Sequence, residues 1–243
     1  MNWLLMGGAL LLGYFCGSIS FARIIVRLAG QDRVQPLDLT SPDGGASLRS
    51  DAVSATAVRL QLGARWGLTC AAGDILKAFL PVLALRIAFP GEPYLYAAAL
   101  GALVGHNWPV FHRFKGGRGQ SPMLGSMLAI APLGAIVCSL AGFVLGYYVI
   151  RDAMTSDNLG QLLYIPWVWV AGLGPWAITW ALAANITFFG SYAGEIRQYA
   201  AGRRAGHLRD PDDVMRMMRM DYEWMPGVSR RAPIDDTDSD DSR

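Results

Sequence analysis

The sequence predicts an all-α integral membrane protein, a compact bundle of about seven transmembrane helices, or five if two short hairpins are single spans. Of the 243 residues, 53% are hydrophobic and only 16% are charged, below the ~25% charged residues of a typical soluble domain. The apolar residues gather into long runs between residues 3 and 190, as membrane spans require. We therefore expect one membrane domain at 1–204 and a polar tail at 205–243.

The first apolar run covers residues 3–28. It is longer than a signal peptide and lacks a basic leader, so we expect it to remain in the mature protein. Small residues recur along it at helical spacing, which suits close packing against another helix. These residues are Gly13, Gly17, Ser18 and Ser20.

A polar, arginine-containing segment follows at 29–65. Its basic residues are Arg33, Arg49, Arg59 and Arg65. Because basic loops tend to stay in the cytoplasm, we expect this segment inside the cell and the N-terminus outside. We interpret the stretch 41–47 as an inserted loop.

The second run, 66–89, carries Asp74 and Lys77 in its middle. Residues three apart lie on one helical face, so we expect an intramembrane ion pair, which lowers the cost of placing charge at membrane depth. Charges inside membranes usually face a cavity or a substrate path. We favour a functional role over a purely structural ion pair.

The remaining runs leave the number of spans open. The turn Gly91-Glu92-Pro93 has no basic residue and suits the outer side, and the run 94–111 returns the chain to the cytoplasm. The run 122–150 is interrupted at Pro132, and the glycines and proline at 172–175 predict a turn within 161–190. Each run is therefore either one tilted helix or two short ones, and the C-terminus is cytoplasmic in both cases.

The tail is polar and ends in an acidic stretch. Arginines near its start either fix topology or hold anionic lipid headgroups; they are Arg203, Arg204 and Arg209. We expect a short helix at 211–220 and disorder at 226–243. The three cysteines lie within apolar runs and indicate neither a disulfide nor a metal site. No internal repeat supports a transporter, and nothing indicates a nucleic-acid partner.

A basic, glycine-rich loop joins residues 105 and 122. Gly116, Gly117 and Gly119 allow backbone N–H groups to approach a ligand, and Lys115 and Arg118 add positive charge. Pro122 suits the first turn of a following helix, whose free N–H groups would favour a phosphate or carboxylate. The alternative is a cytoplasmic loop that only orients the flanking helices. His106 and His112 flank the loop and suit either proton transfer or structural hydrogen bonds.

Several stretches together resemble a known family. The loop reads GHNWPVFHRFKGGRG, residues 50–58 read SDAVSATAV, and residues 73–78 read GDILKA. They are similar to the motifs GHxxPxFxxFKGGKG, SGNxGATNV and DxxKG of the bacterial membrane glycerol-3-phosphate acyltransferases that use acyl phosphate, the PlsY family. The resemblance spans about residues 8–204. The family's third motif, HRxNIxRLLxGxE, aligns with Tyr192, Glu195, Ile196, Gly202 and Arg204.

This resemblance implies a seven-helix bundle in the bacterial inner membrane with a site that faces the cytoplasm. It implies transfer of an acyl chain from acyl phosphate to the 1-hydroxyl of glycerol 3-phosphate or a similar phosphorylated acceptor, with membrane lipids as further partners. It implies no metal, no coenzyme A and no other cofactor. The catalytic residues that it implies are Ser50, Arg59, His106 and Lys115. The phosphate-binding residues are Ser50, Thr56, Lys115, Gly116, Gly117, Arg118 and Gly119. Backbone N–H groups and cations suit two anionic substrates.

The sequence departs from the family pattern at polar positions. Ala52 and Ala57 stand where the first motif has asparagine, and Leu60 stands where it has arginine, with Arg59 beside it. These changes leave open a second function, that of a catalytically silent family member acting as a membrane scaffold or regulator.

Overall fold

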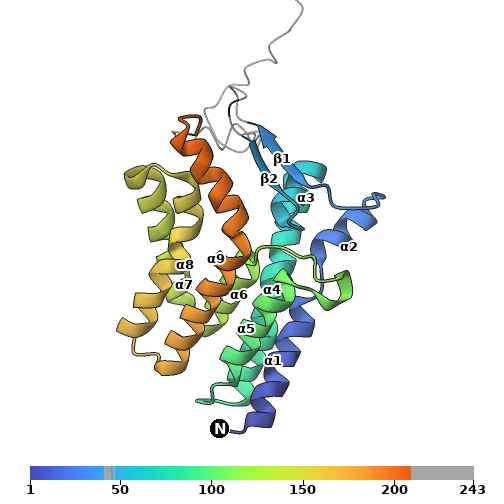
Figure 1. Cartoon of the computed structure of the whole chain (residues 1–243). Coiled ribbons are helices and arrows are strands. Elements are labelled where there is room, and N and C mark those ends of the chain that lie inside the picture. The colour runs from blue at the N-terminus through green and yellow to red at the C-terminus, as the bar shows by residue number, and fades with distance from the viewer. Residues whose placement is uncertain (41–44, 46, 209–243) are drawn as a thin grey trace, which may run out of the picture.

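The protein is a long bundle of helices that carries a two-stranded sheet at one end (Figure 1). The computed structural model describes residues 1–40, 45 and 47–208. The helix expected at 211–220 and the disorder expected at 226–243 lie outside the described residues. In chain order, the elements are α1 (Trp3–Gly17), α2 (Phe21–Leu28), β1 (Leu37–Thr40), β2 (Ser47–Ser50), α3 (Ala55–Leu62), α4 (Ala64–Ala88), α5 (Tyr94–Asn107), η1 (Val110–His112), α6 (Gln120–Ile130), α7 (Pro132–Val144), η2 (Leu145–Ile150), α8 (Ala153–Val170) and α9 (Pro175–Arg204).

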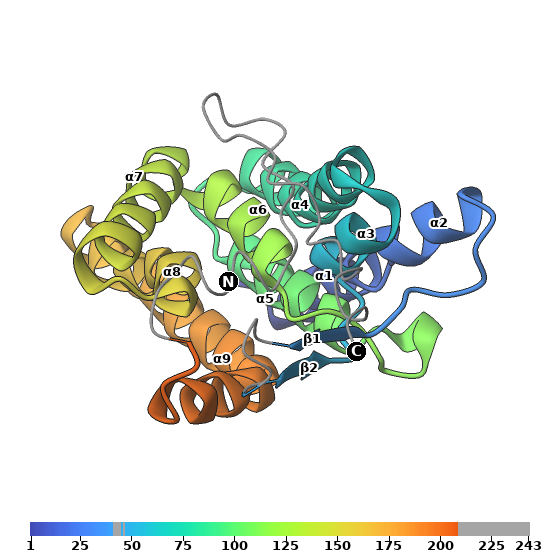
Figure 2. The same cartoon turned by 90° about the horizontal axis from the view of Figure 1, so that it is seen from above.

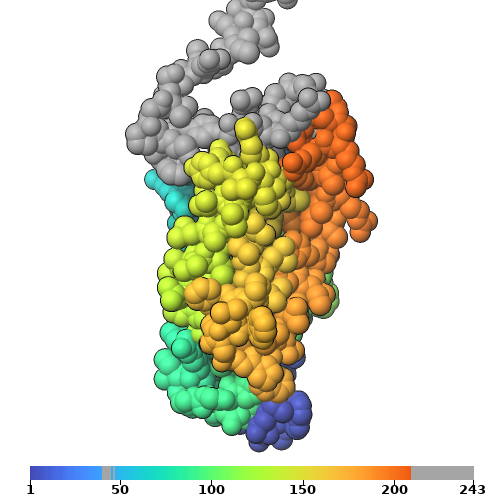
Figure 3. Space-filling model, turned by 90° about the vertical axis from the view of Figure 1, so that its left-hand side faces the viewer, coloured from blue at the N-terminus to red at the C-terminus, as the bar shows by residue number. Residues whose placement is uncertain are grey.

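The predicted membrane fold class is confirmed. Among the described residues, three segments are long and apolar enough to cross a membrane: Trp3–Leu28, Ala64–Ala88 and Pro132–Ile150. Large apolar side chains cover the outside of the bundle where a soluble protein would present polar groups. Figure 3 shows α7 and α8 running along one side of this elongated body.

The small residues of the first run pack as predicted. A Cβ atom added at Gly13 would lie 2.0 Å from the carbonyl oxygen of Ala98, and one at Gly17 would lie 2.1 Å from that of Ala102. Glycine therefore allows the backbones of α1 and α5 to touch. This contact fixes α5, whose last turn carries His106.

Helix breaks fall near the residues that the sequence marks. The bend of the first run after Gly17 is the exception, because the sequence predicts one continuous span at 3–28. Beyond the bend, α2 leaves the direction of α1 with one face buried against α3 and α4. The run 122–150 divides at Ala131, because the residue before a proline disfavours helical geometry. The turn between α8 and α9 contains Gly172 and Gly174 at positive φ, as the glycine pattern predicts.

The segment 29–65 is more structured than the expected polar loop. It forms the antiparallel pair β1–β2, in which Leu39 lies opposite Leu48, and then helix α3. The side chain of Gln198 on α9 accepts a hydrogen bond from the Arg49 N–H at 2.8 Å and donates one to the Arg49 carbonyl oxygen at 3.1 Å. The hairpin is thereby attached to α9, as the view from above shows (Figure 2).

The two ends of the bundle differ in character. The N-terminus and the α4–α5 and α8–α9 turns lie at one end, and the hairpin, α3 and the end of α9 lie at the other (Figure 1). A cavity lined by polar and charged side chains lies toward the second end.

Candidate functional site

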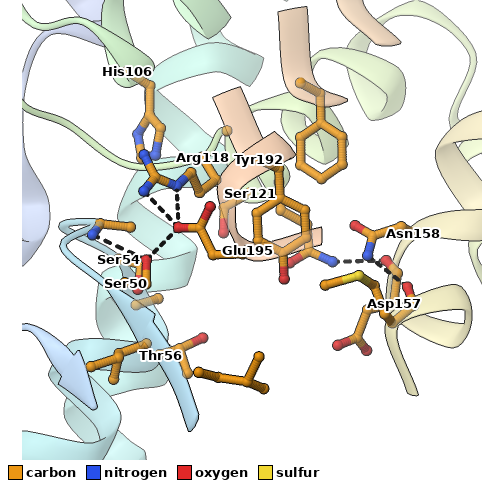
Figure 4. Close-up of a pocket in the computed structure, with 18 of the residues that line it drawn as sticks. Ser50, Ser54, Thr56, His106, Arg118, Ser121, Asp157, Asn158, Tyr192 and Glu195 are labelled. Carbon is orange, nitrogen blue, oxygen red and sulfur yellow. Dashed lines mark hydrogen bonds and ion pairs between the residues drawn. The ribbon is translucent and has the colours of Figure 1, made fainter. Parts of the chain in front are cut away.

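A cavity of about 190 Å³ lies between the hairpin, the starts of α3, α6 and α8, and the middle of α9 (Figure 4). Its apolar lining comes chiefly from the hairpin and from Met154 and Phe188. Its polar and charged lining residues are Arg49, Ser50, Ser54, Thr56, Asp74, His106, Arg118, Gln120, Ser121, Asp157, Asn158, Tyr192 and Glu195. The cavity therefore combines an apolar wall with a dense group of hydrogen-bonding side chains.

Two helices point their N-termini at this cavity. Ser54 caps α3, accepting a hydrogen bond from the Ala57 N–H at 3.2 Å, and α6 starts after Gly119, whose φ is +93°. Residues of both first turns, Thr56 and Ser121, line the cavity. The first N–H groups of a helix lack partners within it and carry partial positive charge. Their convergence favours an anion here.

Arg118 and Ser50 both bond to one carboxylate oxygen. Oε1 of Glu195 accepts a hydrogen bond from the Ser50 hydroxyl at 2.6 Å and from Nε of Arg118 at 2.7 Å, and it lies 2.6 Å from a terminal guanidinium nitrogen (Figure 4). The guanidinium also lies 3.1 Å from the carboxylate of Asp51, an 83% exposed side chain. The guanidinium of Arg118 is therefore held by two carboxylates, those of Glu195 and Asp51.

A buried ion pair holds His106 in place. Lys77 and Asp74 form the pair that the sequence predicts, at 2.7 Å, and both side chains are only 3% exposed. The Lys77 ammonium also donates to the Ile19 carbonyl oxygen at 2.7 Å and lies 2.9 Å from Nδ1 of His106. An ammonium has only donors, so Nδ1 must accept, and the hydrogen of the imidazole is inferred to lie on Nε2.

The glycine loop is pressed against this histidine. A Cβ atom at Gly117 would lie 2.1 Å from Nε2 of His106, and the Gly117 N–H donates to the His106 carbonyl oxygen at 3.1 Å. The Gly116 carbonyl oxygen accepts from the Val53 N–H at 3.0 Å. Gly116 and Gly117 line a small cavity of about 10 Å³ on another side of His106, whereas Gly119 lines the main one.

The structure brings together part of the predicted set. Ser50, Thr56, His106, Arg118 and Gly119 all line the main cavity, although they come from four separate segments. This arrangement joins the first motif to the glycine loop in space.

Two cations that the resemblance assigns to the site, Lys115 and Arg59, lie outside the lining of the main cavity. Lys115 has an exposed side chain, and its carbonyl oxygen accepts a hydrogen bond from Arg23 at 2.7 Å. Arg59 lies on α3, where its Cβ approaches Gly67 of α4, and neither cation is among the residues that line the main cavity. His112 is also outside the lining, and its burial, together with Arg23 and Arg27, lowers its pKa.

Several lining residues were absent from the predicted set, namely Ser54, Ser121, Asp157, Asn158, Tyr192 and Glu195. Tyr192 and Glu195 align with positions of the third family motif, and this alignment could have indicated that they belong to the site. Nothing in the sequence near Asp157 and Asn158 points to the cavity. Their helix is held by Asp152, which caps it, accepts from the Tyr199 hydroxyl at 3.0 Å and pairs with Arg203.

Within the described part of the chain, no three His, Cys, Asp or Glu side chains gather in a way that suits a metal ion.

Known proteins with similar sequences share one description. A family model described as glycerol-3-phosphate acyltransferase matches residues 8–202. The chain is 33% identical to the glycerol-3-phosphate acyltransferase of Neisseria meningitidis serogroup C (strain 053442), over 66% of this chain and 82% of the relative. It is 34% identical to the protein of that name from Methylorubrum extorquens (strain PA1), over 83% and 92% of the two chains.

Solved structures agree with the sequence relatives. The chain is similar to crystal structures of PlsY, an integral membrane glycerol 3-phosphate acyltransferase. The TM-score is 0.69 at 25% identity for the lysophosphatidic acid form and 0.68 at 26% for the glycerol 3-phosphate form. Both comparisons cover 82% of this chain and 93% of the other. The chain is a membrane protein that belongs to the glycerol-3-phosphate acyltransferase family.

Proposed function

We propose that this chain moves a fatty acyl group from acyl phosphate to the 1-hydroxyl of glycerol 3-phosphate, or of a similar phosphorylated acceptor, in phospholipid synthesis. The observation that carries the proposal is the convergence of Arg118, Ser50, Thr56 and two helix N-termini on one cavity. Both substrates are anionic, and such donors suit phosphate oxygens. The names of the relatives support the same reaction class.

The reaction needs no covalent nucleophile from the protein. The acceptor hydroxyl oxygen attacks the carbonyl carbon of the acyl phosphate and forms the new ester bond. The bond from that carbon to the bridging oxygen breaks, phosphate leaves with the electron pair, and the hydroxyl proton passes to the departing phosphate. Because phosphate is a good leaving group, the protein mainly has to position the hydroxyl and stabilise the developing oxyanion.

The side chains divide these tasks in our proposal. Arg118, Ser50, Thr56 and the N–H groups at the start of α6 hold phosphate oxygens. His106 offers an Nε2–H donor whose orientation is set by Lys77. Lys115 and Arg59, outside the cavity lining, contribute positive charge that attracts anionic substrates to this end of the bundle. Gly116 and Gly117 keep the loop close to His106.

We also propose an orientation in the bacterial inner membrane. The N-terminus lies outside and the site faces the cytoplasm, with residues 1–204 as the membrane domain and 205–243 as a cytoplasmic tail. The glycine loop and the arginines of the hairpin segment support this orientation, because basic residues stay on the cytoplasmic side.

The test is a direct transfer assay with purified protein in lipid nanodiscs. Palmitoyl phosphate serves as donor, and labelled glycerol 3-phosphate is compared with other phosphorylated acceptors. The matched controls are Arg118→Ala, expected to lose activity, and Glu92→Gln, at the opposite end of the bundle. Acylated product that depends on the donor and on Arg118 supports the proposal, and its absence with every acceptor contradicts it.

One observation favours the second function, a silent membrane scaffold or regulator. Glu195 already occupies Arg118 and Ser50, and a substrate phosphate has to compete with it. Saturable binding of palmitoyl phosphate without turnover on any acceptor would identify this function.

A further inference from the structure

The anion-binding donors of the cavity already hold an anion, and it belongs to the protein. Ser50 and two guanidinium nitrogens of Arg118 lie 2.6 to 2.7 Å from the same oxygen, Oε1 of Glu195. These distances are those of short, charge-assisted hydrogen bonds. The Glu195 side chain is only 13% exposed, so water screens these bonds little.

The donors that Glu195 engages are those proposed for a substrate phosphate. Arg118 and Ser50 line the cavity, and Glu195 lies between them (Figure 4). A guanidinium edge that already faces a carboxylate cannot present the same N–H groups to a phosphate. A phosphate beside the carboxylate would also face a like charge. Glu195 and the substrate phosphate are therefore alternatives at these donors.

We propose that Glu195 is a built-in competitor that sets the affinity of the cavity for phosphorylated substrates. Glu195 holds Arg118 and Ser50 in position through these contacts, and substrate binding requires it to release both. The cavity consequently discriminates against weakly charged anions, since only a ligand that replaces the charge of the carboxylate regains the lost contacts. This inference rests on the proposed binding of phosphorylated substrates in the cavity.

Asp51 provides an internal comparison. Its carboxylate also approaches Arg118, at 3.1 Å, but its side chain is 83% exposed. An exposed ion pair contributes little, because water and salt screen it. Removal of the Asp51 charge should therefore affect ligand binding much less than removal of the Glu195 charge.

The experiment measures glycerol 3-phosphate binding by calorimetry for the purified full chain and three variants. Glu195→Gln keeps the shape of the side chain, removes its charge and is expected to bind glycerol 3-phosphate about tenfold more tightly than the parent, the size expected for a charge-assisted contact. Asp51→Asn should change the affinity by less than about threefold. Glu92→Gln, whose carboxylate lies 3.8 Å from the N-terminal ammonium, should leave it unchanged.

A thermal measurement separates competition from a merely structural role. Loss of the ion pair lowers the unfolding temperature of Glu195→Gln without ligand, but the rise on adding glycerol 3-phosphate should exceed that of the parent, because tighter binding stabilises the folded state more. A structural role alone predicts the first effect without the second. If Glu195→Gln does not fold, Glu195→Asp, with a shorter reach to both donors, should show a smaller gain in affinity.

Equal or weaker binding by the Glu195 variants overturns the inference. Failure of the competitor inference can be distinguished from failure of the proposed acyltransferase function, because ligand binding is measured without turnover. Tighter binding by Glu195→Gln with no acyl transfer by either protein supports the competitor and contradicts the acyltransferase. Acyl transfer by the parent without tighter binding by the variant contradicts the competitor alone.

Discussion

The ammonium of Lys77 lies 2.9 Å from Nδ1 of His106 inside the helix bundle, and this contact decides what the histidine can do. The ammonium also forms an ion pair with Asp74 and donates a hydrogen bond to the Ile19 carbonyl oxygen. His106 cannot take a proton on Nδ1 without losing this contact. The geometry favours a fixed hydrogen-bond donor over a general base.

We predict that His106 is neutral and carries its hydrogen on Nε2 at pH 7. The chain contains three histidines, so ¹⁵N spectra of histidine-labelled protein can be assigned by comparison with His106→Gln. Lys77→Met should abolish the tautomer preference and destabilise the fold by about 3–5 kcal/mol, because Asp74 is left buried and unpaired. Asp74→Asn with Lys77→Met is the control that avoids the unpaired charge. A cationic or Nδ1-protonated His106 in the parent would disprove the assignment.

Gly117→Ala should remove activity while the protein still folds. The added methyl group would meet Nε2 of His106 at 2.1 Å, so either the ring or the loop must move. A displacement of about 1 Å at a catalytic group can cost about a hundredfold in rate. The matched control is Gly8→Ala, where an added Cβ meets none of the described residues within 4 Å. Acyl transfer rates and unfolding temperatures of both variants check this, and a fully active Gly117→Ala would refute it.

Lys115 and Arg118 of the glycine loop should differ in importance. Arg118 lines the cavity, whereas Lys115 has an exposed side chain outside the lining. We predict that Arg118→Ala weakens phosphate-ligand binding by about 1–3 kcal/mol, the value for a lost charge-assisted hydrogen bond. Lys115→Ala should cost less than about 1 kcal/mol at physiological salt. Calorimetric titration with glycerol 3-phosphate measures both losses of binding free energy. A larger loss for Lys115→Ala than for Arg118→Ala would show that Lys115 contacts the phosphate directly.

Local patterns predicted the parts of the fold that depend on local physics. Hydrophobic runs placed the membrane helices, and Pro132 and the glycines at 172 and 174 marked real interruptions. The hairpin escaped prediction because it is stabilised from a distance. Gln198, 149 residues away in sequence, bonds to the Arg49 backbone, and no local pattern contains that contact.

The sequence motifs also predicted part of the site, but not the contacts that depend on how distant segments pack. The glycine loop and the first motif supplied Ser50, Thr56, His106, Arg118 and Gly119, which the fold brings to one cavity. The sequence could not show that Glu195 occupies two of these donors, because that depends on the packing of α9 against the hairpin. It also could not separate Arg118 from Lys115, since their difference lies in the direction of each side chain.

The orientation in the membrane makes a further prediction. Single cysteines are introduced at Glu92, whose side chain is 41% exposed, and at the exposed Arg33. The native Cys16, Cys70 and Cys138 of this chain are replaced by alanine. An impermeant thiol reagent on intact cells should label position 92 and not position 33, because basic segments remain inside. Labelling after the cells are opened controls for accessibility. The reverse pattern would place the cavity outside.

Restoring polarity at the first motif should help at one position and harm at the other. Ala52 and Ala57 both stand where the family motif has asparagine, but only Ala52 is among the residues that line the cavity. Its N–H already donates to the Ser50 hydroxyl at 3.2 Å, so an asparagine side chain there would lie beside a phosphate-binding group. Ala57 is 2% exposed in the packed face of α3.

We therefore predict that Ala52→Asn raises kcat/KM for glycerol 3-phosphate by about tenfold or more, as expected for a donor used in the transition state. Ala57→Asn should instead destabilise the fold by about 1–3 kcal/mol, because its amide enters a site filled by a methyl group and finds no assured partner. Transfer kinetics and unfolding temperatures of the single variants separate the two effects. If Ala52→Asn leaves the rate unchanged while Ala57→Asn raises it, the acceptor approaches α3 from the other side, and the cavity assignment of the first motif is wrong.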